Sequence, residues 1–221
     1  MFSPSSKSRL TRHDLGRFPD DTLFHRVARA ACAAGCLPRK ELYEAWEVAR
    51  RVRRRFRGGR IVDLCGGHGL LGQLLLVLDD TSLAAVIVDR AIPASAETLH
   101  GAMVAAWPRL EGRVSFRTSD VAGVTLAADD LVVSVHACGV LTDTVLTRAL
   151  AAGARVAVLP CCHDLDRHDD GGLSGWMAGP IAVDAVRATR LAAHGWRVWT
   201  QTIPAEITPH NRLLMAAPPD S

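Results

Sequence analysis

The chain has 221 residues, 48% of them hydrophobic and 22% charged, and its formal net charge at pH 7 is +3. This length fits one globular domain, and the charge is far below that of a histone-like nucleic-acid binder. No apolar run approaches the roughly 20 residues of a membrane helix, and the basic, serine-rich N-terminus lacks the apolar core of a signal peptide. We therefore expect a soluble cytoplasmic protein without membrane association, whose six cysteines are reduced thiols, reactive groups or metal ligands rather than disulfides.

The N-terminal part divides into an arm and a pair of helices. Residues 1–19 are rich in serine and basic side chains, and we expect a disordered basic arm. N-cap residues precede a predicted helix over 22–34, and apolar residues with a period near 3.6 predict a second helix over 39–57. Residues 20–58 are therefore assigned to N-terminal helices and residues 59–221 to the main domain.

Basic side chains gather where the second helix meets the main domain. The simpler interpretation is a solvated helix face, and the alternative is a patch that contacts RNA phosphates or an acidic partner. Few aromatic residues accompany these arginines, so a base-stacking platform is not indicated. The arginine cluster consists of Arg50, Arg51, Arg53, Arg54, Arg55, Arg57 and Arg60.

Strand and helix patterns alternate along the main domain. This alternation predicts a doubly wound α/β fold with a mostly parallel, seven-stranded, Rossmann-like sheet. The last two strands have no helix between them, so they should form an antiparallel hairpin. The expected strands are 61–64, 83–89, 114–119, 130–136, 155–159, 196–203 and 212–217, and the expected helices are 70–78, 94–107, 141–152 and 181–193.

The most informative segment is Arg60-Ile-Val-Asp-Leu-Cys-Gly-Gly-His-Gly-Leu-Leu-Gly72. A β-branched run ends near an acid, Asp63, and glycines then lead into an apolar helix. Glycines let the backbone approach a ligand closely, and a helix start offers free N–H groups. The segment therefore predicts a strand, a tight turn and a helix N-terminus that cradle an adenosine-containing cofactor.

Two cofactors compete for this turn. The spacing Gly67-x-Gly69-x-x-Gly72, with Asp89 farther on, matches a dinucleotide fingerprint and predicts an NAD-type oxidoreductase. S-adenosylmethionine is favoured by the final hairpin, by Asp63 at the end of the first strand, and by Asp120, which could accept from an adenine amino group. Asp89 and Asp120 could instead be simple helix N-caps.

A cysteine–histidine cluster is predicted where two neighbouring strands end. The fourth strand leads to His136 and Cys138, and the fifth to Cys161, Cys162 and His163. The thiols could be small buried apolar groups, ligands of zinc or iron, or parts of a catalytic site. Either histidine could take a proton from a nucleophile that attacks a methyl sulfonium.

The combined motifs resemble a known family. Asp63-Leu-Cys-Gly-Gly-His-Gly69, His136-Ala-Cys-Gly-Val-Leu-Thr-Asp143 and Pro160-Cys-Cys-His163 are similar to a group of class I S-adenosylmethionine-dependent methyltransferase domains. The group includes methyltransferase-like proteins with a Cys-Cys motif and a methyltransferase domain fused to glutathione-transferase-like segments, and it is also similar to the tRNA acceptor-stem 2′-O-methyltransferases. The resemblance spans roughly residues 39–217. Cys65 stands where these enzymes usually have their first glycine, and we find no counterpart of the tRNA enzymes' zinc-finger module.

The resemblance implies methyl transfer from S-adenosylmethionine to an oxygen or nitrogen nucleophile. RNA, and tRNA in particular, is the favoured acceptor, through the arginine cluster, and a small molecule is the other option. The alternatives are an NAD-type oxidoreductase and a non-catalytic cofactor- or metal-binding protein. The expected catalytic residues are His136, Cys138, Cys162 and His163, and the expected cofactor contacts are Asp63, Cys65, Gly66, Gly67, Gly69, Asp89 and Asp120.

Overall fold

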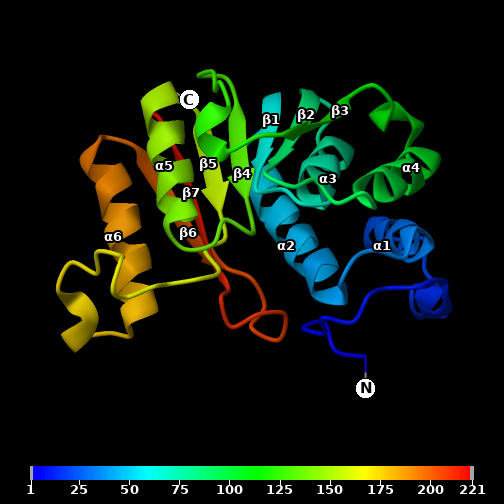
Figure 1. Cartoon of the computed structure of the whole chain (residues 1–221), viewed down its shortest axis with the longest axis horizontal. Coiled ribbons are helices and arrows are strands. Elements are labelled where there is room, and N and C mark those ends of the chain that lie inside the picture. The colour runs from blue at the N-terminus through cyan, green and yellow to red at the C-terminus, as the bar shows by residue number, and fades with distance from the viewer. Residues whose placement is uncertain (1, 220–221) are drawn as a thin grey trace.

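A computed structural model describes residues 2–219 of the chain, and a seven-stranded sheet forms its centre (Figure 1). The strand order is β3-β2-β1-β4-β5-β7-β6, in which the first five strands are parallel and β7 runs antiparallel to both β5 and β6. The predicted α/β fold and its C-terminal antiparallel hairpin are therefore confirmed. The strands are β1 (Gly59–Leu64), β2 (Ser82–Asp89), β3 (Val114–Thr118), β4 (Leu131–Ser134), β5 (Arg155–Val158), β6 (Arg197–Thr202) and β7 (Arg212–Ala217).

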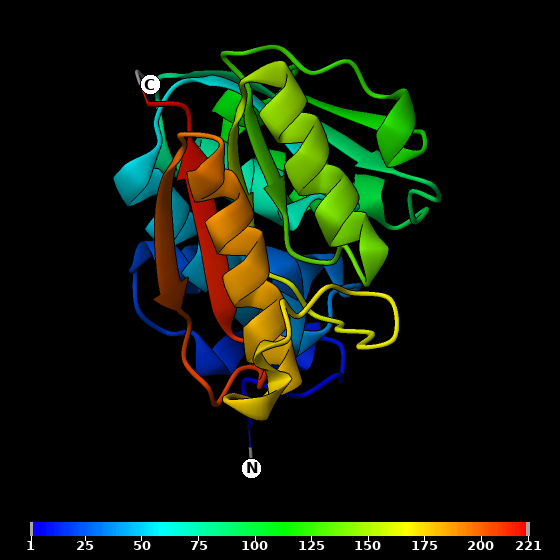
Figure 2. The same cartoon turned by 90° about the vertical axis from the view of Figure 1, so that its left-hand side faces the viewer.

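Helices cover both faces of the sheet (Figures 1 and 2). Helices α5 and α6 lie on one face, and α1 to α4 lie on the other. None of the helices within residues 2–219 is both long and apolar enough to span a bilayer. The α-helices are α1 (Leu23–Ala34), α2 (Arg39–Arg55), α3 (Leu70–Leu78), α4 (Ala96–Ala106), α5 (Val140–Ala152) and α6 (Gly179–Ala193), and the 3₁₀ turns are η1 (Arg12–Arg17), η2 (Pro108–Leu110), η3 (Val121–Gly123) and η4 (Leu173–Gly175).

The central strands are apolar on both sides because both of their faces are covered. Successive side chains of a strand point to opposite faces. Ile61 and Val133 therefore join the core beneath α1 to α4, whereas their neighbours Val62 and Val132 join the core beneath α5 and α6. This double burial explains why these strands read as continuous β-branched runs rather than as alternating patterns.

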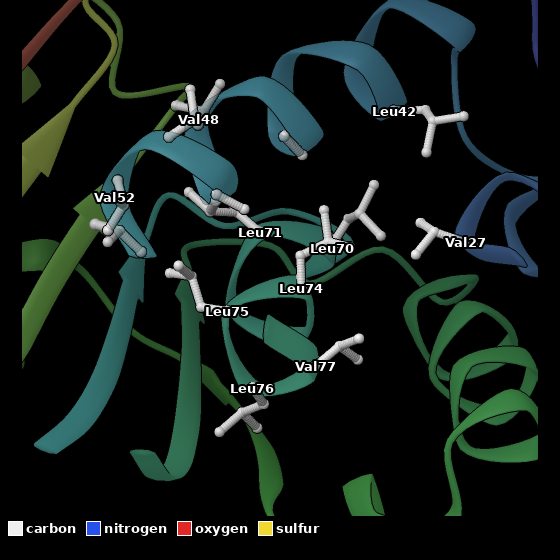
Figure 3. Close-up of a cluster of buried hydrophobic side chains, with 14 of the residues drawn as sticks. Val27, Leu42, Val48, Val52, Leu70, Leu71, Leu74, Leu75, Leu76 and Val77 are labelled. Atoms are coloured by element: carbon white, nitrogen blue, oxygen red, sulfur yellow. The ribbon is translucent and has the colours of Figure 1, made fainter. Parts of the chain in front are cut away.

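Helix α2 packs on α3, which holds the N-terminal helices against the main domain (Figure 3). Leu42, Val48 and Val52 of α2 lie close to leucines of α3 in one buried cluster. Helix α3 is apolar on nearly all sides, as expected for a helix enclosed between the sheet and other helices. Each fully buried leucine or valine side chain stabilises the fold by about 1.5–3 kcal/mol.

The N-terminal segment is packed, so the expectation of a disordered arm over residues 1–19 is wrong for the described residues 2–19. The side chains of Leu10 and Phe18 are 0% and 2% exposed. The N–H of Leu10 donates to the Leu37 carbonyl at 2.8 Å, and the N–H of Arg39 donates to the Ser8 carbonyl at 2.9 Å. These two apolar anchors and the backbone contacts outweigh the serine-rich, basic composition on which the expectation was based.

Several elements end earlier than the sequence pattern suggested. Strand β4 ends at Ser134, so His136 lies in the loop beyond the strand. Helix α2 ends at Arg55 because Phe56 adopts an extended backbone, and the Phe56 ring packs edge-on against Trp199, with centroids 5.7 Å apart. Hydrophobic periodicity could not detect these endings, since the apolar pattern continues past both of them.

Candidate active site

The turn between β1 and α3 has the geometry that the glycine-rich segment predicted. Cys65, Gly67 and Gly69 all have positive φ angles, of 57°, 51° and 73°. Gly69 is the N-cap of α3, and the Gly72 N–H in the first turn of that helix donates to the Asp63 carboxylate at 3.0 Å. One buried carboxylate thereby joins the C-terminal end of β1 to the first turn of α3.

The glycines of this turn have two different roles. A Cβ atom at Gly66, Gly69 or Gly72 would come within 2.5–2.8 Å of the Ile87 side chain, so these glycines let the turn pack against β2. A Cβ atom at Gly67 would meet nothing within 4 Å. Among the glycines of this turn, only Gly67 thus combines a conformation that favours glycine with open space that a ligand can enter.

A pocket of about 290 Å³ opens at this turn. It lies beyond the carboxyl ends of β1 and β4, where the order of the parallel strands reverses, and ligands of open α/β sheets bind at such positions. Helix α2 contributes one wall. The lining residues are Leu37, Glu41, Ala45, Asp63, Cys65, Gly66, Gly67, His68, Leu70, Leu71, Pro93, Val135 and His136.

Two carboxyl groups in the pocket wall retain protons more strongly than usual. Burial raises the pKa of Asp63 to about 7, and the negative charge of Asp89 adds to this effect, while the hydrogen bond from Gly72 opposes it. Burial and the neighbouring Glu44 raise the pKa of Glu41 to about 6, against the charge of Lys40. Both groups would ionise more readily beside a bound cation, so the pocket is suited to a positively charged ligand.

The two remaining predicted carboxylates differ in position. Asp89, at the end of β2, accepts from the N–H of Gly67 at 3.0 Å and from that of Ala91 at 3.2 Å, so it supports the turn directly. The Asp120 side chain is 50% exposed, caps η3 and pairs with Arg90 at 2.6 Å. Asp63 and Asp89 therefore gather at the turn, whereas Asp120 is a helix cap outside the pocket lining.

Two histidines line the pocket. His136 lies at its mouth, and the surrounding protein lowers the pKa of its imidazole by desolvation, assisted by the charge of Lys40. His68 lies between the glycines of the turn and is held by Ser95, whose Oγ is 3.0 Å from Nε2. Glu41 lies 3.9 Å from Nδ1 of the same ring. Neither His68 nor Glu41 was selected from the sequence.

Three of the predicted cysteines come together where β4 and β5 end. The sulfur of Cys161 lies 3.0 Å from that of Cys138 and 3.6 Å from that of Cys162. All three sulfurs lie within 4.8 Å of one another. Desolvation by burial raises the pKa values of the Cys138 and Cys161 thiols.

The His163 side chain does not join this group. Its Nε2 lies 2.9 Å from Oδ1 of Asp184 on α6, and the side chain is only 1% exposed. Asp184 also accepts from Arg212 at 2.6 Å and from Arg187 at 3.1 Å. His163 thus belongs to a buried ionic network that ties the chain after β5 to α6 and β7, away from the pocket lining.

The arginine cluster lies toward the other end of α2. Arg50 and Arg51 pair with Glu47, Arg53 donates to the Leu78 carbonyl at 2.6 Å, Arg55 stacks over Trp199, and Arg60 pairs with Asp130 at 2.7 Å. Within residues 2–219, only Arg54 and Arg57 of this cluster are exposed and have no side-chain partner.

Comparison with known proteins identifies the family. Residues 40–167, more than half of the chain, match the family model described as a methyltransferase domain. The chain belongs to this methyltransferase family. The matched region contains the β1–α3 turn, every pocket lining residue except Leu37, and the three clustered cysteines.

Several solved structures share the fold of this chain. An O-methyltransferase family protein from Burkholderia thailandensis aligns over 95% of this chain and 63% of its own, with 20% identity and a TM-score of 0.52. A putative O-methyltransferase from Nostoc punctiforme aligns over 87% of this chain and 60% of its own, with 17% identity and a TM-score of 0.54. The tRNA methyltransferase TrmK of B. subtilis aligns over 77% of this chain and 65% of its own, with 13% identity and a TM-score of 0.52. The present chain thus spans less than two thirds of the length of each of these three proteins. A search of curated proteins found no significant match.

Proposed function

We propose that this methyltransferase domain binds S-adenosylmethionine in the pocket at the β1–α3 turn and transfers its methyl group to an oxygen or nitrogen nucleophile. The observation that carries the proposal is the open space at Gly67 beside two carboxyl groups, Asp63 and Glu41. The cofactor's ammonium and sulfonium groups are cations, and carboxylates in a partly dry pocket stabilise cations well. Asp89 ends β2, where its remaining lone pairs can accept from ribose hydroxyls.

The same carboxyl groups argue against an NAD-type dinucleotide. The pyrophosphate of a dinucleotide is anionic and binds at the start of the helix after the glycine turn. Asp63 and Glu41 lie in the wall around that helix start and would repel a pyrophosphate whenever either is ionised. Charge complementarity therefore favours the cationic cofactor over the dinucleotide.

The chain's own residues have few tasks in this reaction. Bound S-adenosylmethionine supplies an electrophilic methyl group, and transfer depends mainly on alignment and exclusion of water. The pocket walls orient the cofactor, and His136 at the pocket mouth takes the proton of the attacking hydroxyl or amine. Cys138 follows His136 by two residues, and we propose that it and the neighbouring Cys162 contact the acceptor. His163, held by Asp184, has no part in the proposed chemistry.

RNA is the acceptor class that we propose to test first. Arg54 and Arg57 support it, since they are exposed and free to contact phosphates. Glu41, which lines the pocket, and Arg54 are 13 residues apart on α2, which corresponds to about 20 Å along the helix axis at 1.5 Å per residue. An RNA acceptor would therefore extend along α2 to reach both the pocket and these arginines.

Transfer of a labelled methyl group tests the function directly. We would incubate the protein and labelled S-adenosylmethionine with RNA, protein and small-molecule fractions of a cell extract, alongside a Gly67→Val variant. We expect label in one fraction, with wild-type protein only. Label in no fraction, or equal labelling by the variant, would contradict the proposed function. Label confined to the protein or small-molecule fraction would reject RNA and retain methyl transfer.

A further inference from the structure

We propose that Cys138, Cys161 and Cys162 form a binding site for one zinc ion, with their sulfur atoms as three thiolate ligands. The sulfurs of Cys138 and Cys161 lie 3.0 Å apart, those of Cys161 and Cys162 lie 3.6 Å apart, and every pair lies within 4.8 Å. Zinc binds thiolates strongly, and three sulfurs that share one small volume are a suitable set of ligands.

Strand pairing brings the three sulfurs together. Cys138 follows β4, and Cys161 and Cys162 follow β5. These strands are parallel neighbours, with Ser134 opposite Val158, so both chains leave the sheet at the same edge. The ligands therefore do not need the local Cys-x-x-Cys spacing of small zinc modules, because the sheet supplies the long-range part of the geometry.

The distances between the sulfurs fit a shared ion better than a disulfide. A zinc–sulfur bond is about 2.3 Å, so two sulfurs on a tetrahedral zinc ion lie about 3.8 Å apart. The separations of 3.0 Å and 3.6 Å are both closer to that value than to the length of a disulfide bond, and the third pair lies within 4.8 Å. A disulfide needs about 2.05 Å between two sulfurs and gives no role to a third one close by.

Three protein ligands leave one zinc position open. Within the described part of the chain, no histidine or carboxylate completes this group to four ligands. Structural zinc sites usually have four protein ligands, whereas sites that bind an exchangeable ligand have three. We therefore infer that the fourth position takes a ligand from solution.

The site adjoins the proposed cofactor pocket. His136, two residues before Cys138, lines that pocket, and Cys138 lies close enough to the pocket residue Cys65 to interact with it electrostatically. If the proposed methyl transfer is correct, the open zinc position can hold the acceptor's oxygen or nitrogen atom near the methyl group. This role rests on the proposed function, whereas the zinc site itself does not.

Zinc binding here involves proton release and no redox change. Three thiols lose three protons to solvent as three zinc–sulfur bonds form, and the three thiolates with Zn²⁺ carry a net charge of −1. No oxidant or reductant is required.

The test measures zinc in the full-length protein, purified under reducing conditions without chelator and dialysed against zinc. Mass spectrometry should find one zinc per wild-type chain, and the Cys138→Ser, Cys161→Ser and Cys162→Ser variants should each lose most of it. Cys36→Ser is the matched control, because Cys36 is buried elsewhere and its contact with the Ser95 carbonyl suits a hydroxyl. Circular dichroism and cooperative thermal unfolding, measured on each sample, show whether the variants remain folded, and S-adenosylhomocysteine binding is measured separately as the test of the proposed function.

The outcomes separate the two proposals. Zinc-free wild-type protein, zinc retained by all three variants, or a Cys138–Cys161 disulfide in the reduced preparation would overturn the zinc site, while S-adenosylhomocysteine binding would still support the proposed function. Zinc present without S-adenosylhomocysteine binding would support the proposed zinc site and contradict the proposed methyl transfer. In cobalt-substituted protein, added imidazole should shift the visible absorption bands, and unchanged bands would overturn the open position.

Discussion

The carboxylate of Asp63 accepts the N–H of Gly72 at 3.0 Å and also lines the pocket. One side chain thus fixes the start of α3 relative to β1 and contributes an acidic group to the ligand site. A buried carboxylate with a single backbone partner is poorly solvated, which is why its pKa is raised to about 7.

This arrangement predicts that the protein becomes less stable as the pH rises. The folded-state pKa of Asp63, about 7, lies above the ordinary value of 3.8, so the unfolded chain releases this proton at lower pH than the folded protein does. The stabilisation is complete below about pH 4 and is lost as pH rises through 7. Between pH 5 and 8 this group should lower the free energy of unfolding by roughly 2–3 kcal/mol.

Urea denaturation of wild-type protein and Asp63→Asn at several pH values measures this effect. The amide keeps an acceptor for the Gly72 N–H but cannot ionise in this range. We expect the variant to lack the decline that the wild type shows from pH 5 to 8. Parallel stability curves for the two proteins would show that Asp63 does not titrate as described.

Glu41 should strengthen the binding of a cationic cofactor. Its pKa of about 6 predicts that S-adenosylmethionine affinity rises from pH 5 to 7.5, because the ligand's positive charge favours the ionised carboxylate. Glu41→Gln should weaken binding on the order of ten-fold at pH 7.5 and flatten this dependence. The exposed Glu111 provides the control, Glu111→Gln. Equal losses in both variants, or none in Glu41→Gln, would exclude Glu41 from the site.

Cys65 should tolerate glycine better than valine. Its φ of 57° lies in the left-handed region, which costs a non-glycine residue about 1–2 kcal/mol and is worse for β-branched side chains. We expect Cys65→Gly to stay within about 1 kcal/mol of wild type, because the relief of strain offsets the entropy of glycine. Cys65→Val should lose clearly more in urea denaturation. Equal stability of the two variants would contradict the strain argument.

RNA binding through the arginine cluster should weaken as the salt concentration rises and should depend on Arg54 and Arg57. Each phosphate contact to single-stranded RNA contributes about 0.7 to the slope of log affinity against log salt. The double change Arg54→Ala and Arg57→Ala should therefore reduce the slope by about 1.4 in filter binding, while Arg190→Ala, on α6, should not. An RNA affinity that does not change with salt concentration, or an unchanged slope in the double variant, would exclude this surface as the RNA contact.

Much of the fold followed from sequence patterns, for physical reasons. The strands of the parallel core are continuous β-branched runs, and α3 is an apolar run bounded by Gly69 and Asp79, so its bounds were predicted without error. The N-terminal segment was misjudged because its order depends on Leu10 and Phe18, two apolar residues in a polar stretch. Tertiary contacts of this kind leave no periodic signal in a sequence.

The site was predicted in part. The β1–α3 turn and the three cysteines followed from the motifs and from the pairing of β4 with β5. His68 could have been selected, because it lies between two glycines of the turn. Glu41 could not, since its place in the pocket depends on how α2 packs against α3. The His163 side chain was misplaced because its partner Asp184 lies on α6, 21 residues away.

Calorimetric titration tests the central claim, the cofactor pocket at Gly67, most directly. Wild-type protein, Gly67→Val and Gly112→Val would each be titrated with S-adenosylhomocysteine and with NAD. Gly112 also has a positive φ, of 70°, and open space around it, so it matches the backbone strain at Gly67 without touching the pocket. We predict micromolar binding of S-adenosylhomocysteine to wild type and Gly112→Val, none to a folded Gly67→Val, and no binding of NAD. Binding of NAD alone, or undiminished S-adenosylhomocysteine affinity in Gly67→Val, would contradict the account.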